Sequence, residues 1–182
     1  DKSLREILQM VALMPMAIPG IVLGLAYIFF FNAKDNPLNF IYATMAILVI
    51  NTVVHFYTVS HLSAVTAVKK LDQEFESVSL SLKVPIYKMF FKITLPVCLP
   101  TVFDIFIYLF CNAMTTVSGV IFLYSYDTTL ASVSAIHLDE QGDVAGAAAM
   151  AMLIVYISFV VRGLHTLVST LLLRRTQAWR NI

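Results

Sequence analysis

Residue types that could carry out chemistry are few in this sequence, and they are not grouped as an active site requires. The histidines have no metal-ligand spacing, and neither H-E-x-x-H nor G-x-S-x-G occurs. Cys98 and Cys111 lie in apolar surroundings, where cysteine is typically a small packing residue. The sequence also lacks G-x-x-x-x-G-K-[ST], the phosphate-binding loop of many ATPases. We therefore expect no catalytic residue, no metal and no cofactor.

Two sets of polar side chains fall inside strongly apolar stretches. The members of each set recur at helical spacing and so share one helical face. Polar groups in hydrocarbon are costly unless they are paired or face water. Two interpretations stay open: a lining for a solute pathway, or interhelical hydrogen bonds worth about 0.6 kcal/mol each. The candidates are Asn51, His55, Asp104, Tyr108, Asn112 and Thr116.

Asp104 is the most costly member of these sets, because it carries a charge. It lies eight residues past Pro96, or about 12 Å along a helix, which places it near the inner boundary of a span. Arg162, in a later apolar stretch, is a possible ionic partner. Its side chain could instead snorkel to the membrane interface, which is the interpretation that we favour.

The composition indicates which elements must position these groups. The chain of 182 residues is 59% hydrophobic and 13% charged, against about 45–50% and about 25% in soluble domains. Several stretches exceed the roughly 20 apolar residues that a bilayer crossing needs. We therefore expect an all-α polytopic membrane protein, a helical bundle with four spans at about 7–32, 38–64, 97–123 and 144–173. The net charge of +1 gives no basic field to recruit nucleic acid.

The positive charges are distributed unevenly between the two sides of these spans. Most lie in the N-terminal tail, in the loop 69–94 and in the C-terminal tail. They are Lys2, Arg5, Lys69, Lys70, Lys83, Lys88, Lys92, Arg174, Arg175 and Arg180. Because Lys and Arg concentrate on the cytoplasmic side, we expect both ends and this loop to be cytoplasmic.

The loop 69–94 is predicted to form two short helices outside the bilayer core. Apolar residues recur at helical spacing from Leu71 to Leu82, and Pro85 predicts a turn at Lys83–Val84. A second apolar and basic helix follows Pro85. The loop could lie on the membrane surface, or its apolar face could dock into a groove of a cytoplasmic partner.

The same loop resembles a known motif. Glu76–Leu82, Phe90 and Ile93–Pro96 resemble the EAA loop of the permeases of ABC importers. Aligned on the terminal Leu-Pro, the E-A-A falls at Ser77–Ser79 and the family's glycine falls at Lys83. The sequence therefore keeps the second half of the motif and departs from the first half.

Two further segments extend the resemblance over nearly the whole chain. Met14–Gly24 resembles the P-x-A-I-P-G segment that opens the permease domain, and Gly142–Ala149 resembles the small-residue opening of its last helix. The resemblance is closest to permeases of the 2-aminoethylphosphonate and iron(III) types. Ser79–Pro85 and Leu123–Asp127 favour the phosphonate branch over iron(III).

The resemblance implies that residues 1–182 are a single transmembrane domain of the type I importer kind, the C-terminal part of a longer permease. It implies a bacterial inner membrane location and three protein partners: a cytoplasmic ATP-binding subunit, a second permease half and an extracytoplasmic solute-binding protein. The loop would be the docking element for the ATP-binding subunit. Its docking residues would be Phe75, Glu76, Ser77, Val78, Ser79, Leu82 and Lys83.

Two other classes of function stay open on the sequence. The chain could be a structural membrane subunit that transports nothing, or a secondary transporter driven by an ion gradient. Helices broken at mid-membrane would favour the gradient-driven transporter. Pro15, Pro19 and Gly20 predict one such break, and the sequence shows no matching second break.

Overall fold

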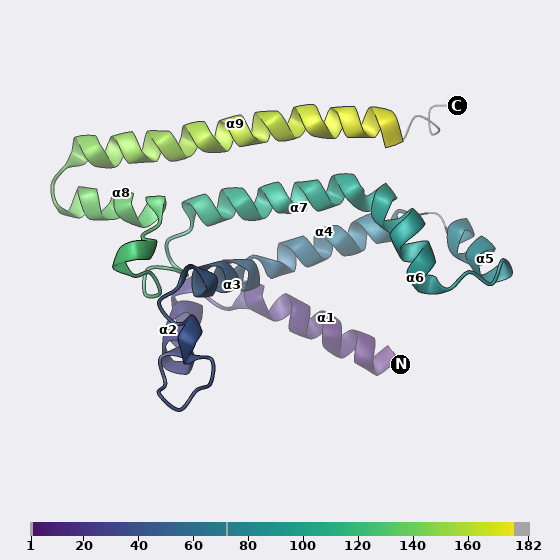
Figure 1. Ribbon diagram of the computed structural model, residues 1–182, viewed down its shortest axis with the longest axis horizontal. Coiled ribbons are helices and arrows are strands. Elements are labelled where there is room, and N and C mark those ends of the chain that lie inside the picture. Colours follow the sequence, from purple (N-terminus) through teal and green to yellow (C-terminus); the bar gives the residue numbers. More distant parts are fainter. Residues whose placement is uncertain (1, 72, 177–182) are drawn as a thin grey trace. The chain divides into compact units, whose positions relative to one another are not determined.

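The computed structural model describes residues 2–71 and 73–176, and side chains within 3–71 and 77–170. No strand occurs among these residues, so the expected all-α class is confirmed. The elements, shown in Figure 1, are α1 (Lys2–Ala17), α2 (Gly20–Phe31), η1 (Asn39–Ile41), α3 (Met45–His55), α4 (Tyr57–Lys69), α5 (Gln73–Ser81), α6 (Ile86–Met89), the π-helical η2 (Phe90–Thr94), α7 (Leu95–Thr115), η3 (Tyr126–Thr128), α8 (Ala131–Glu140) and α9 (Val144–Thr176).

The chain divides into two compact units. The first comprises the residues up to Val59 together with Leu109–Val160. The second comprises Ser60–Tyr108 and the described residues from Val161 onward. The second unit therefore holds the loop 69–94, and the first holds the bent helices of the N-terminal part.

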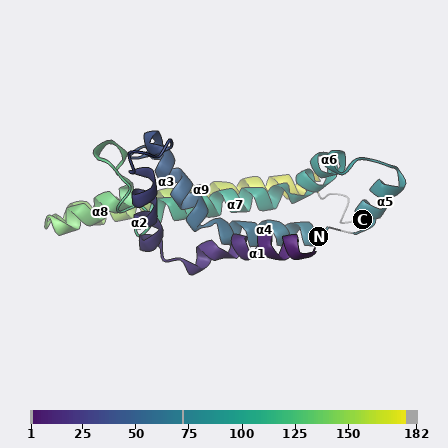
Figure 2. The same cartoon turned by 90° about the horizontal axis from the view of Figure 1, so that it is seen from below.

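Two helical segments are long and apolar enough to cross a membrane, Ile86–Thr115 and Val144–Thr170. Two further helix pairs qualify only together, because each pair is bent. The bend is 105° between α1 and α2, which is visible in Figure 2, and 55° between α3 and α4. By length and composition, the described chain therefore has two candidate spans, or up to four if each bent pair is one span.

The bend between α1 and α2 has the cause that the sequence predicts. Pro15 and Pro19 lack a backbone donor, and Pro19 directly precedes Gly20, the first residue of α2. The bend between α3 and α4 lies at Phe56, without a proline or glycine nearby. The expectation of a single break was therefore wrong, since a second bent pair is present.

The expected third span, 97–123, is helical only up to Thr115. The residues that follow use their carbonyl groups in contacts with other segments. Ser132 Oγ donates to Thr116 O at 2.7 Å, and Asn51 Nδ2 donates to Gly119 O at 2.8 Å. These bonds, together with the weak helix propensity of glycine, favour an irregular path from Thr116 to Leu130.

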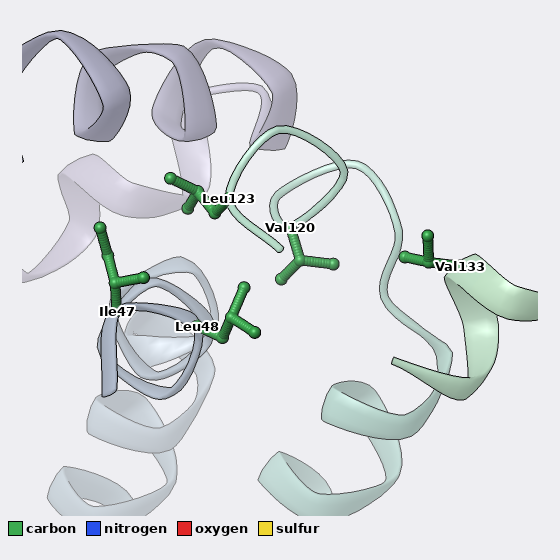
Figure 3. Close-up of a cluster of buried hydrophobic side chains, with 5 residues drawn as sticks. All are labelled: Ile47, Leu48, Val120, Leu123 and Val133. Atoms are coloured by element: carbon green, nitrogen blue, oxygen red, sulfur yellow. The ribbon is translucent and has the colours of Figure 1, made fainter. Parts of the chain in front are cut away.

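A small apolar core holds the first unit together. It joins α3, the irregular segment after α7, and α8, as Figure 3 shows. Its buried members are Ile47, Leu48, Val120, Leu123 and Val133. Most other large apolar side chains of α1, α2 and α9 are exposed, as membrane-embedded helices require.

Candidate functional site

The loop 69–94 folds as two helices with a defined turn, as predicted. Helix α5 ends in a left-handed residue, Lys83, whose φ is 52°. The Val84 N–H bonds to Ser79 O, and the Lys83 N–H bonds to Leu80 O, both at 3.0 Å. This pair of bonds is the Schellman motif, in which the left-handed position usually holds glycine. The turn thus ends α5 at the position where the EAA alignment places the family's glycine.

The turn leads into α6, which continues through η2 into α7 without an intervening loop (Figure 1). Residues Ile86–Thr115 form one continuous helical segment that crosses from the loop into the membrane-spanning part.

Apolar side chains of α5, and that of Leu82 just after it, are largely exposed in the described part of the chain. Val78 is exposed, and Leu82 is 69% exposed. Ser77 and Lys83 are also exposed, whereas Ser79 is buried and its hydroxyl donates to Val84 O at 3.4 Å. Phe75 and Glu76 lie within α5, but their side chains fall outside the described ones.

Asp104 and His165 bring α7 and α9 into contact within the second unit. Asp104 Oδ1 of α7 lies 3.1 Å from His165 Nε2 of α9. The contact has the distance of an ion pair without the geometry of a hydrogen bond. The partner of Asp104 is thus His165 rather than Arg162, the residue that the sequence suggested. Arg162 is exposed one turn earlier on α9.

Tyr108, Asn112 and Thr116 were expected on one helical face with Asp104. They do not all lie on one helix. Tyr108 and Asn112 lie on α7 and are partly buried. Thr116 lies just past the last residue of α7, although its N–H still bonds to Asn112 O at 2.8 Å. The shared helical face therefore ends at Asn112.

The polar residues of α3 and α4 have packing partners within the first unit. Asn51 is 1% exposed, and its Nδ2 donates to Gly119 O. Thr58 Oγ donates to Ala12 O at 2.9 Å, which ties α4 to α1. The Thr58 bond joins two helices, whereas the Asn51 bond joins α3 to the irregular segment after α7. His55 is half-buried and packs edge-on against Phe56.

Glycine at two positions lets neighbouring segments of the first unit approach each other closely. A Cβ on Gly20 would lie 2.5 Å from Ser118 Oγ, and a Cβ on Gly119 would lie 2.9 Å from Asn51 Nδ2. Only glycine fits both positions without displacing a neighbour. These two contacts could not be predicted from the sequence, because they join residues far apart in the chain and leave no local pattern.

Residues 1–174 match the family described as the binding-protein-dependent transport system inner membrane component. The chain belongs to this family. Membership places it in a multi-pass protein of the inner membrane. The description is that of a transport component, which agrees with the expectation that the chain is not an enzyme.

Relatives of the chain within this family are ferric transport permeases. It is 29% identical over 157 residues to the ferric transport system permease protein FbpB of Actinobacillus pleuropneumoniae, which covers 86% of the chain and 22% of the relative. It is 34% identical over 124 residues to FbpB 1 of Haemophilus influenzae, covering 68% of the chain and 19% of the relative. The chain therefore spans about a fifth of the length of these two relatives.

A shorter relative and a solved structure are also similar to the chain. The ferric transport system permease-like protein AfuB of Escherichia coli is 28% identical over 92 residues, covering 50% of the chain and 77% of the relative. A bacterial ABC transporter that imports the acidic polysaccharide alginate superposes with a TM-score of 0.74 at 15% identity, covering 93% of this chain and 67% of that chain. The fold is therefore that of an ABC importer permease.

Proposed function

We propose that this chain is the membrane-spanning permease part of an ATP-driven importer. The family match over residues 1–174 carries the proposal. Residues 1–182 contain no phosphate-binding loop, and in this proposal a separate ATP-binding subunit supplies the energy. A second permease half would complete the pathway, and a solute-binding protein would deliver the solute from the outer side.

The loop 69–94 is the proposed docking element for the ATP-binding subunit. Two observations support this role: the uncovered apolar side chains of α5, and the uninterrupted helix from α6 into α7. Burying a Val or Leu side chain in a partner's groove contributes about 1.5–3 kcal/mol each. The proposed docking residues remain Phe75–Ser79, Leu82 and Lys83, on the cytoplasmic side with both ends of the chain.

The proposed solute is iron(III). The relatives in Actinobacillus and Haemophilus are named as ferric transport permeases, and the one in Escherichia is named as ferric transport permease-like. None of them supports the phosphonate branch that the segments Ser79–Pro85 and Leu123–Asp127 favoured. We accordingly keep 2-aminoethylphosphonate as the competing solute in the test.

Uptake into vesicles tests the proposal. The intact transporter is reconstituted with its ATP-binding subunit and its solute-binding protein, and uptake of radiolabelled iron(III) and of 2-aminoethylphosphonate is compared. We expect iron(III) uptake that requires ATP and stops when the ATP-binding subunit is catalytically inactive. Uptake of the phosphonate alone would overturn the proposed solute.

The two bent helix pairs favour one competing function, a transporter driven by an ion gradient. In the same vesicles, this alternative predicts uptake that follows an imposed ion gradient and continues with the inactive ATP-binding subunit. Uptake of either solute under those conditions would contradict the ATP-driven mechanism. Absence of all uptake from an assembled complex would favour a purely structural subunit.

A further inference from the structure

Asp104 has an exposed carboxylate in the middle of a spanning helix. The residue is 61% exposed at its side chain and lies within the span Ile86–Thr115. A charged group in this position faces the bundle interior or a water-filled cavity, because hydrocarbon cannot solvate it. The environment of this carboxylate must therefore be polar in the assembled transporter.

The lipid-facing side of α7 lies elsewhere. Val102 and Phe106 are exposed apolar residues on the same helix. At 3.6 residues per turn, Phe106 lies about 200° around the helix from Asp104, and Val102 lies about 160° away. These side chains suit lipid or an apolar partner surface, which leaves the opposite face, with Asp104 and Tyr108, for water.

His165 lies beside the carboxylate. The imidazole is only 14% exposed, and its Nε2 lies 3.1 Å from Asp104 Oδ1. The remaining exposure of Asp104 leaves the carboxylate accessible to a passing solute. Carboxylate oxygens are ligands that hard cations prefer, and they repel anions.

We propose that Asp104, positioned by His165, is a contact point for a multivalent metal cation on its way through the permease. The inference rests on the proposed function and deepens it, since it assigns the cationic solute to a particular side chain. The site also opposes anionic solutes such as phosphonates. Asp104 binds the cation transiently, while His165 keeps the carboxylate oriented toward the pathway.

The test uses the intact reconstituted transporter with Asp104→Asn, Asp104→Glu and His165→Gln. Three quantities are measured: co-purification of the ATP-binding subunit, ATP hydrolysis stimulated by the loaded binding protein, and uptake of radiolabelled iron(III). Asp35→Asn is the matched control, because it removes an exposed carboxylate from the loop between α2 and α3.

We expect Asp104→Asn to lower iron(III) uptake about tenfold, as the loss of one charge-assisted contact implies. Assembly and ATP hydrolysis should persist, so fewer ions move per ATP. Asp104→Glu should restore part of the uptake, His165→Gln should give an intermediate loss, and Asp35→Asn should match the wild type. If only the number of ions moved per ATP falls, Asp104 contacts the solute in the pathway. If co-purification of the ATP-binding subunit also falls, Asp104 acts in assembly.

Two results would overturn the inference while the proposed function stands. One is wild-type iron(III) uptake in Asp104→Asn. The other is loss of the assembled complex in both Asp104→Asn and Asp104→Glu, which would make Asp104 a structural residue. A wild-type transporter that imports the phosphonate and no iron(III) would instead overturn the proposed solute, and the cation contact with it.

Discussion

Lys83 adopts a backbone conformation that glycine usually supplies. Its φ of 52° ends α5, and the hydrogen bonds of Lys83 and Val84 close the turn. A side chain in the left-handed region costs about 1–2 kcal/mol, a cost that glycine does not have. The departure from the EAA glycine thus changes the stability of the turn rather than its shape.

We therefore expect Lys83→Gly to stabilise the turn by about 1 kcal/mol. Amide hydrogen exchange in the purified transporter should show slower exchange at residues 83 and 84. Lys83→Ala keeps a Cβ in the left-handed region and serves as the control, with little change expected. Faster exchange in the glycine variant would contradict this. It would mean that the added conformational freedom of glycine in the unfolded chain costs more than the relief of left-handed strain gains.

Gly20 is the second position where one atom decides the packing. A Cβ there would lie 2.5 Å from Ser118 Oγ and 3.3 Å from His55 Cε1. Gly20→Ala should lower the stability of the transporter by about 1–3 kcal/mol, as overpacking does. Gly163→Ala is the control, because nothing lies within 4 Å of its added Cβ. Thermal unfolding in detergent measures the stability of both variants. Equal melting temperatures for Gly20→Ala and Gly163→Ala would contradict the close contacts described at Gly20.

Helix α5 carries most of the proposed docking residues. Loss of an apolar docking side chain should weaken assembly about tenfold or more, whereas an exposed ion pair contributes only about 0–1 kcal/mol. Leu82→Ala and Phe75→Ala should therefore uncouple ATP hydrolysis from uptake more severely than Glu76→Gln. Ser81→Ala is the control, since its hydroxyl only returns to Ser77 O within the helix. Wild-type coupling in Leu82→Ala would show that the helix is only a surface loop.

The elements differ in how far the sequence predicts them. The loop with its turn, the last span and the break at Pro15–Gly20 follow from local signals, namely charge, proline and hydropathy. The bend at Phe56 and the end of α7 at Thr115 do not, because tertiary hydrogen bonds such as Asn51 to Gly119 O accompany them. The pairing of Asp104 with His165 was missed for the same reason, since helical spacing gives faces but no partners.

At the scale of the molecule, the chain carries more exposed apolar surface than its own contacts cover. Large apolar side chains are exposed along α1, α5 and α9. Lipid accounts for those on the spanning helices, whereas the ATP-binding subunit is the proposed cover for the exposed residues of α5.

Cross-linking of α5 to the ATP-binding subunit tests the central claim most directly. In a cysteine-free background, Val78→Cys should cross-link to cysteines introduced along the partner's surface, and the yield should change when ATP binds. Tyr126→Cys, at an exposed position expected on the outer side, should give no such cross-link. Cross-links from position 126 but none from position 78 would reverse the orientation of the chain and contradict the proposed coupling.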